Sequence, residues 1–295
     1  MSDFKGPQNE LGIPQVGHID AHCHLADQRL DAKRDQIIQR AGLAGISHFI
    51  QGGVGPEDWE RQLALVTRYP GKISTTFGLH PWWISSHSAL ECEEGFEKLL
   101  SWLKRYRPRG LGELGLDHSP RQLNSGGGPA ETEARQTEYF ERQLKLASAE
   151  KLPLVLHIVH AHPQAQSILE SFGRAEIRAL GGIVHSFSGD LQAARNYFDF
   201  GLKISISGSV ITRKSGKAFE KLKQAVVSLP LESLVIETDS PDQPPADWGG
   251  TESPARLNEP VTLLQVAAAI GRFKAVSSEA VLKRSRVNLE AVFFK

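Results

Sequence analysis

Eight short runs of apolar, often β-branched residues recur along the chain, and an amphipathic stretch long enough for a helix separates each run from the next. This alternation is typical of strand–helix repeats, in which helices cover a sheet of parallel strands. We expect four of the intervening helices at Pro56–Tyr69, Glu91–Tyr106, Glu131–Glu150 and Asp190–Phe200. The eight strands are expected at His18–Leu25, Ile46–Gly52, Ile73–His80, Gly110–Asp117, Pro153–Val159, Gly182–Gly189, Lys203–Gly208 and Leu234–Ser240.

The number of runs selects among α/β folds. A chain of 295 residues has room for two domains or for one large barrel. A doubly wound open sheet usually has about five to seven strands and a glycine-rich first turn, but neither G-x-G-x-x-G nor G-x-x-x-x-G-K-[ST] follows any run. We therefore predict a single, slightly distorted TIM-type (β/α)8 barrel over residues 18–295, preceded by a flexible leader over residues 1–17.

Composition indicates which binding partners and which cellular compartment to expect. Its 34 Lys and Arg balance 34 Asp and Glu, so no net basic field draws it to nucleic acid, and any anion site has to be local. Cys23 and Cys92 are too few for a disulfide scaffold, which favours a reducing compartment. No signal peptide or long apolar segment stands out. We expect a cytoplasmic monomer without a membrane partner.

Polar side chains able to bind metals stand near the carboxyl ends of the runs, where a buried strand normally carries Val, Ile or Leu. In a barrel these ends converge on one mouth, so residues far apart in sequence become neighbours there. The residues concerned are His22, His24, His80, Glu113, Asp117, His157, His185 and Asp239.

His22 and His24 are spaced to act as a pair. Residues two apart in a strand share a face, so both imidazoles can point into the mouth while Cys23 points the other way as a small buried hydrophobe. The pair could chelate one metal, or each ring could simply be hydrogen-bonded on its own.

Glu113 is the most demanding of these residues, because a carboxylate inside an apolar strand needs a compensating cation. It could bridge two metals or form a buried salt bridge with an arginine. His157 and His185 each offer one nitrogen ligand, although either alone could be a core histidine. Asp239 could bind a metal, accept a proton from water or cap the turn before Pro241.

Counted together, these residues supply enough ligands for two three-ligand metal sites if Glu113 serves both. Positions left open for water and substrate are typical of catalytic metals. A nucleophilic serine is unsupported, since the chain has no G-x-S-x-G motif. Asp117 could belong to the site or merely cap the loop that follows, the Gly-rich stretch Ser119–Glu131, which we expect to be flexible.

The motifs, taken in order, resemble the TatD family of metal-dependent deoxyribonucleases within the amidohydrolase superfamily. They run from His18 almost to the end of the chain: HIDAHCHL, FGLHP, GELGLD, LPLVLH, VHSFSG, ETDSP and LNEP. The resemblance implies two divalent cations (Mg²⁺, Mn²⁺ or Zn²⁺). It places His22, His24 and Asp239 around one cation and His157 and His185 around the other, with Glu113 bridging both.

The resemblance also implies hydrolysis of DNA phosphodiesters, typically from the 3′ end of single strands. His80 is then expected to contact the scissile phosphate, and Asp239 to accept a proton. Trp82 and Trp83 could stack on a base, or pack as core or rim residues. Val159 stands where the family usually has a basic or polar residue, and His160 or His162 could replace that contact.

Three hypotheses follow for the activity. The leading one is a two-metal hydrolase acting on DNA ends. The second is an amidohydrolase-type enzyme that cleaves a small-molecule amide, ester or lactone, because the same metals polarise carbonyl groups. The third is a metal-binding scaffold without catalysis.

Overall fold

The computed structural model describes residues 17–125, 127–208, 215–245, 248 and 257–295. Apart from Gly17, the predicted leader lies outside these residues. No helix in the described part of the chain is long and apolar enough to span a membrane.

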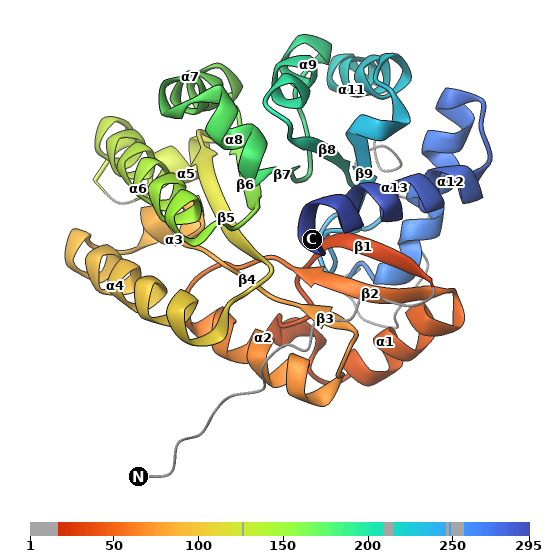
Figure 1. Cartoon of the computed structure of the whole chain (residues 1–295), viewed down its shortest axis with the longest axis horizontal. Coiled ribbons are helices and arrows are strands. Elements are labelled where there is room, and N and C mark those ends of the chain that lie inside the picture. The colour runs from red at the N-terminus through yellow and green to blue at the C-terminus, as the bar shows by residue number, and fades with distance from the viewer. Residues whose placement is uncertain (1–16, 126, 209–214, 246–247, 249–256) are drawn as a thin grey trace.

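Parallel strands form the wall of a barrel and helices surround it (Figure 1). Hydrogen-bonded ladders join β1 to β3 and β4 to β9, each in chain order. The end of β1 meets the segment after β9, where the Asp239 N–H donates to His22 O (3.0 Å) and the His24 N–H donates to Ser240 O (2.6 Å). The predicted TIM-type barrel is confirmed. Its strands are β1 (His18–Cys23), β2 (Ile46–Gln51), β3 (Ile73–Ser74), β4 (Thr76–Phe77), β5 (Gly110–Asp117), β6 (Leu154–Val159), β7 (Gly182–Val184), β8 (Lys203–Ile206) and β9 (Leu234–Ile236).

The third apolar run is where the barrel is most distorted, and the single strand predicted over Ile73–His80 is wrong. It divides at Thr75 into β3, which pairs with β2, and β4, which pairs with β5. Gly78 follows at a point where a Cβ would come within 2.6 Å of the Glu113 carbonyl oxygen. The chain therefore passes too close to β5 for an ordinary residue, and the strand ends early.

The helices start near their predicted positions, and their capping residues explain the differences. The helix predicted from Glu91 begins at Ala89 because Ser88 and Glu91 form a capping box. The helix predicted from Glu131 begins at Pro129, and a short helix occupies part of the loop expected to be flexible. The helices are α1 (Arg34–Leu43), α2 (Pro56–Arg68), α3 (Pro81–Ser86), α4 (Ala89–Tyr106), α5 (Pro120–Leu123), α6 (Pro129–Glu150), α7 (His162–Phe172), α8 (Arg174–Leu180), α9 (Leu191–Asp199), α11 (Lys217–Ser228), α12 (Leu263–Lys274) and α13 (Ser278–Phe293), with 3₁₀ turns η1 (Gln28–Leu30), η2 (Leu231–Ser233) and η3 (Pro260–Thr262).

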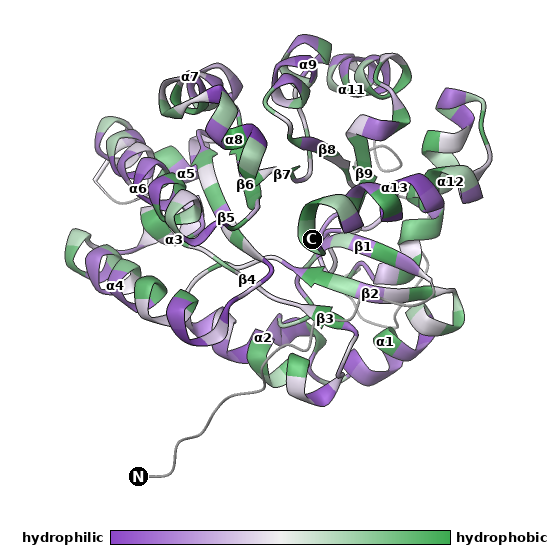
Figure 2. Ribbon diagram, in the orientation of Figure 1, coloured by the Kyte–Doolittle hydropathy of each residue, from purple (hydrophilic) through white to green (hydrophobic). Residues whose placement is uncertain are grey.

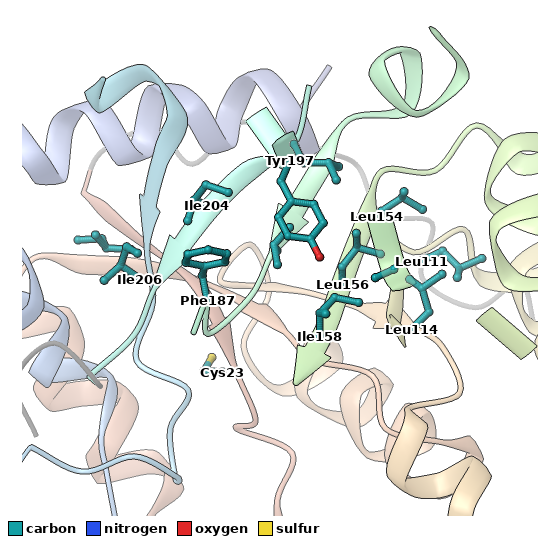
Figure 3. Packing of buried hydrophobic residues seen from close by; sticks show 14 of the residues in the cluster. Cys23, Leu111, Leu114, Leu154, Leu156, Ile158, Phe187, Tyr197, Ile204 and Ile206 are labelled. Carbon is teal, nitrogen blue, oxygen red and sulfur yellow. The ribbon is translucent and has the colours of Figure 1, made fainter. Parts of the chain in front are cut away.

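The apolar residues form two layers. The larger lies between strands and helices, where Leu154, Leu156 and Ile158 of β6 pack beside Leu111 and Leu114 of β5 (Figure 3). The outer faces of the helices are mostly hydrophilic, and the strands mostly hydrophobic (Figure 2). Each fully buried leucine or isoleucine stabilises the fold by about 1.5–3 kcal/mol relative to an exposed one.

The smaller layer fills the inside of the barrel. Ile50, Val155 and Val235 belong to it, together with Leu289 and Phe293 of α13. This helix crosses the end of the barrel and brings the C-terminus near its centre (Figure 1). The interior is therefore apolar at that end, and the polar residues gather at the opposite end, beyond the carboxyl ends of the strands.

Candidate metal centre

Irregular pairing in β1 and β5 aims their functional side chains into the barrel mouth. The register between β1 and β2 shifts just before Cys23, and the register between β5 and β6 shifts around Glu113. Such bulges redirect the neighbouring side chains. His22 and Glu113 consequently face one another inside the mouth, while Cys23 and Leu114 pack among the helices. The predicted orientation of His22 and Cys23 is confirmed.

Glu113 is buried, with 1% of its surface exposed, and its carboxylate lies among histidines. Within the described residues all of its ion-pair partners are imidazoles, so the arginine partner considered as an alternative is not found. These partners are His22, His24, His80, His157 and His185.

The first carboxylate oxygen, Oε1, faces the group from β1 and the segment after β9. It lies 3.6 Å from Nε2 of both His22 and His24, and these two nitrogens are 3.3 Å apart. Asp239 Oδ1 completes the group at 3.8 Å from His22 Nε2 and 3.4 Å from His24 Nε2. Two imidazole nitrogens and two carboxylate oxygens thus converge as the ligands of one cation would.

The second oxygen, Oε2, faces a different group. It lies 2.8 Å from His185 Nε2 and 3.6 Å from His157 Nδ1, and these two nitrogens are 2.9 Å apart. His80 Nε2 is 3.5 Å from the same oxygen. The structure therefore brings together the six predicted metal ligands and His80. Oε1 faces His22 and His24 and Oε2 faces His157 and His185, although His185 also offers a ligand atom within 4.8 Å of those of His22 and Asp239.

The buried polar atoms of this cluster fit a divalent cation. Glu113 Oε1 is buried without a hydrogen-bond partner, an arrangement that is costly unless another group compensates it. Gly52, at the end of β2, borders the same space: a Cβ there would lie 2.5 Å from His22 and 2.7 Å from Glu113 Oε1. The missing side chain keeps this space open beside the converging ligand atoms.

Asp117 holds His157 in the orientation that a ligand needs. Its Oδ2 lies 3.1 Å from His157 Nε2 and also accepts a hydrogen bond from Trp82 Nε1 at 2.5 Å, while its Oδ1 accepts the Ser119 N–H at 2.8 Å. With Nε2–H donating to the carboxylate, Nδ1 presents its lone pair to the mouth. Asp117 thus both caps the loop and supports a ligand.

Two supporting residues were missed by the sequence analysis. Glu237 is fully buried; its Oε1 accepts the Ser186 N–H at 2.5 Å and lies 3.6 Å from His185 Nδ1. It stands just after β9 and two residues before Asp239, so its position in ETDSP was an available signal. Gln243 carried no such signal, yet its Nε2 donates to Asp239 Oδ2 at 2.5 Å and to Ser186 Oγ at 2.6 Å.

Burial and neighbouring charges strongly shift the pKa values of the residues in this cluster. Burial raises the pKa of Glu113, but the surrounding histidines, His185 first, outweigh it and hold that pKa well below its usual range. The same balance, with His24 as the main partner, lowers the pKa of Asp239 to about 2. Burial, reinforced by the charge of His185, keeps the pKa of His22 well below its usual range. Both carboxylates are ionised and His22 is neutral. At His24 and His185 burial is outweighed by the carboxylates, which raise the pKa of His24 to about 9 and that of His185 well above its usual range, so a cation would displace protons from these two rings.

His80 differs from the other histidines in its tautomer. Its Nδ1 accepts the Trp82 N–H at 2.9 Å, so the proton of the neutral ring sits on Nε2 and points toward Glu113. Burial and the nearby His157 lower the pKa of His80 to about 4, which keeps the ring neutral. His80 is therefore arranged as a hydrogen-bond donor in the mouth rather than as a metal ligand.

A cavity of about 780 Å³ opens above these groups. Its lining includes Trp82, which is 48% exposed, and His160, which is also exposed, so both lie where a substrate could reach them. Val159 and His162 line it as well. Trp83 does not: it is 9% exposed, belongs to the apolar core and stacks on His87 at 4.0 Å. The structure therefore shows Trp83 packed in the core, which was the alternative to base stacking.

Comparison with known proteins agrees with this geometry. The model of the family "TatD related DNase" matches residues 19–294. An uncharacterized metal-dependent hydrolase of Escherichia coli, YjjV, is 32% identical over 77% of this chain and 80% of its own length. Its crystal structure superposes with a TM-score of 0.78 at 27% identity, covering 94% of this chain and 98% of that one.

Two named nucleases are similar over nearly the whole chain. Human deoxyribonuclease TATDN3 is 28% identical over 95% of this chain and 96% of its own length. The 3′-5′ ssDNA/RNA exonuclease TatD of Cronobacter sakazakii is 27% identical over 94% of this chain and 98% of its own. A family match across the barrel, with the polar cluster at its mouth, leads to one conclusion: the chain belongs to the TatD-related DNase family and is a metal-dependent hydrolase that acts on ester bonds.

Proposed function

We propose that this protein is a 3′-to-5′ exodeoxyribonuclease that uses two divalent cations to cleave single-stranded DNA from its end. The observation that carries the proposal is the division of ligands at Glu113, whose two oxygens face separate groups. A carboxylate placed in this way is suited to bridge two cations. The polarity and the single-stranded substrate are taken from the name of the Cronobacter sakazakii relative.

The ligand groups define where the cations would sit. His22, His24 and Asp239 would hold one and His157 and His185 the other, with Glu113 shared. Mg²⁺, Mn²⁺ or Zn²⁺ bound there would supply Lewis-acid polarisation of the phosphodiester and a lowered pKa for the attacking water.

The protein's own residues then orient and move protons. Gln243 donates to Asp239 Oδ2 and so orients this carboxylate, which would take up the proton that the attacking water loses. His80 Nε2–H points into the mouth and can donate to a phosphate oxygen on which charge develops. Trp82, exposed beside it, offers a ring face on which a terminal base can stack.

End-labelled oligonucleotides test the proposal. Metal-free protein should leave a single-stranded DNA intact, and Mg²⁺, Mn²⁺ or Zn²⁺ should restore activity. A 5′-labelled strand should then give a ladder that shortens one nucleotide at a time, while a 3′-labelled strand releases its label at once as a mononucleotide. Undiminished cleavage in chelator, or stepwise loss from the 5′ end, would contradict the proposal.

The cavity wall also favours a second candidate, a hydrolase of small esters, amides or lactones. Ile158, Val159 and Phe187 give one side of the cavity an apolar surface. Arg29, a cation of this lining, is already bound to Asp27 and Asp242 at 2.7 Å each. A small substrate with little charge suits such a wall, and the same cations would polarise its carbonyl group.

A substrate panel separates the two candidates. Metal-loaded protein should be assayed on lactones, aryl esters and amides beside the oligonucleotide at equal metal concentration. Turnover of a panel member with no degradation of DNA would select the small-molecule hydrolase. The predicted cytoplasmic location and monomeric state stay predictions from composition.

A further inference from the structure

A second cavity lies at the opposite end of the barrel, where the strands begin. Its volume is about 500 Å³, within the ~300–1,000 Å³ typical of small-molecule sites. The chain just before β5 and β6, the last turn of α6 and the end of α13 all contribute to it. None of the residues assigned to the metal centre lines it.

Four cationic side chains line this cavity: Arg107, Arg109, Lys151 and Lys295. Across the described parts of the chain, none of the four donates a side-chain hydrogen bond or forms an ion pair. Glu150 also lines the cavity but pairs with none of them. By contrast, the guanidinium groups of Arg29 and Arg142 form ion pairs with carboxylates.

Arg109 is the most telling of the four because it is half-buried. Its guanidinium lies over the ring of Phe294, 4.9 Å from the centroid, and burial lowers its pKa. Partial burial of a charge without a polar partner is costly. The cation–π contact offsets part of this cost, and an anion in the cavity would offset more.

Helix ends account for only part of the arrangement. Arg107 and Lys151 follow α4 and α6 in the left-handed conformation, with φ of 43° and 56°, where helix dipoles favour cations. Lys295 directly follows Phe294, the cap of α13, so it too stands at a helix end, whereas Arg109 lies two residues beyond the cap of α4 and still lines the same cavity. Cations from separate segments that line one cavity and outnumber its carboxylate, Glu150, which pairs with none of them, indicate a site for an anion.

We propose that this cavity binds a small phosphate-bearing ligand, of the size of a nucleoside monophosphate or smaller. Guanidinium groups bind phosphate oxygens through paired N–H donors, and the lysines add charge. Leu152 and Phe293 supply an apolar wall for the remainder of the molecule. The site is separate from the metal centre and does not depend on the activity proposed there.

Calorimetric titration of the full chain in chelator tests the site, because chelation removes cation-dependent phosphate binding at the other end. The probes are inorganic phosphate, deoxyadenosine monophosphate and deoxyadenosine. Both phosphate compounds should bind, the nucleoside should not, and the phosphate compounds should raise the melting temperature in a concentration-dependent way. Tighter binding of the nucleotide than of phosphate would assign a role to the apolar wall, and equal binding would assign the site to the phosphate group alone.

Arg107→Asn and Lys151→Asn are the test variants, since Asn tolerates the left-handed conformation and preserves the helix ends. Each should weaken binding about tenfold, as loss of one charge-assisted contact does. Arg109→Gln should weaken it at least as much. Lys104→Asn, an exposed cation of α4 outside the cavity, is the matched control and should bind like the wild type.

Three results would overturn the proposal. One is no binding of either phosphate compound at millimolar concentration. Another is equal weakening by Lys104→Asn, which would show a general charge effect. The third is binding of a single-stranded 20-mer that excludes the mononucleotide and is lost in Arg107→Asn, which would identify a nucleic-acid surface instead. Melting temperatures of the variants without ligand verify that each is folded.

Discussion

The two ends of the barrel collect opposite kinds of charge. At the carboxyl ends of the strands, Glu113 and Asp239 lie buried among histidines, in a cluster suited to bind cations. At the other end, Arg109 and three further cations line a cavity, and none of them pairs with a carboxylate of the described residues, Glu150 of the same lining included. The balance of 34 basic and 34 acidic residues conceals this separation. Net charge therefore says little about what this molecule binds, whereas the location of the charges along the barrel axis says a great deal.

The largest effect should come from removing the charge at the centre of the mouth. We expect Glu113→Gln to lower the rate of DNA cleavage at least about a thousandfold, because an amide cannot serve both ligand groups and the cations supply several kcal/mol of transition-state stabilisation. Glu150→Gln, the same change at the opposite end, should leave the rate unchanged. Equal rates in Glu113→Gln and wild type would break the distinction between the two ends.

The pH dependence of stability should distinguish His48, a buried histidine of β2 outside the metal centre, from the histidines at the mouth. His48 Nδ1 donates to Gly71 O at 3.1 Å and Nε2 accepts from Ser74 Oγ at 2.8 Å, while burial, opposed in part by the Gly71 carbonyl, lowers its pKa to about 4. Its folded pKa lies below its unfolded value of 6.5, so protonation favours the unfolded chain. The stabilisation is complete above pH 6.5 and is lost as pH falls toward 4.

His48→Gln should therefore remove about 3 kcal/mol of the pH-dependent loss of stability between pH 6.5 and 4, at about 1.4 kcal/mol per pKa unit. Urea unfolding of metal-free wild type and variant at pH 7, 5.5 and 4 measures the difference. Parallel stability curves would show that His48 is not held neutral.

A smaller effect is expected at Asp117, which contacts the assigned ligand His157 but is not itself assigned as a ligand. Asp117→Asn removes the charge that orients His157 but keeps an oxygen for the Ser119 N–H. Metal affinity should fall about 10- to 100-fold, as it does when the partner of a ligating histidine is lost. Competition with a chromogenic chelator measures this. Asp199→Asn, an exposed residue at the end of α9, is the control, and equal losses in both variants would exclude a specific role.

The smallest predicted effect concerns substrate contact at the rim. Trp82→Ala should raise the KM for single-stranded DNA about fivefold or more, since stacking on one base contributes about 1–3 kcal/mol. Trp82→Phe keeps a ring but loses the N–H that binds Asp117, and should stay close to wild type in KM. If the phenylalanine variant behaves like the alanine variant, the N–H and not the ring is what matters.

Local pattern predicted the barrel, and it singled out the polar residues that the structure brings together at the mouth. The parallel strands read as apolar runs because they are buried on both faces, and His157, near the end of β6, lies at the mouth as its strand-end position predicted. His185 and Asp239 were expected at the mouth because the carboxyl ends of barrel strands converge there. These features depend on neighbours close in sequence, which is why a single sequence predicts them.

Features set by close approach of distant segments were not predictable. The break at Thr75 and the bulge at Glu113 arise where β4, β5 and the end of β2 crowd together; the Glu113 N–H, for example, donates to Gly53 O at 2.7 Å. Gln243 reaches Asp239 only because of the turn after Pro241, and no local pattern marks it. The burial of Trp83 likewise depends on helices that pack around it.

The most direct test of the central claim is the number of cations bound per chain. Protein purified without added metal, then equilibrated with Mn²⁺ or Zn²⁺ and freed of excess, should contain two ions per chain by elemental analysis. Glu113→Gln should retain one or none, and Glu150→Gln should retain two. A single ion in the wild type that Glu113→Gln keeps with unchanged affinity would contradict the account of Glu113 as the carboxylate shared between two cations.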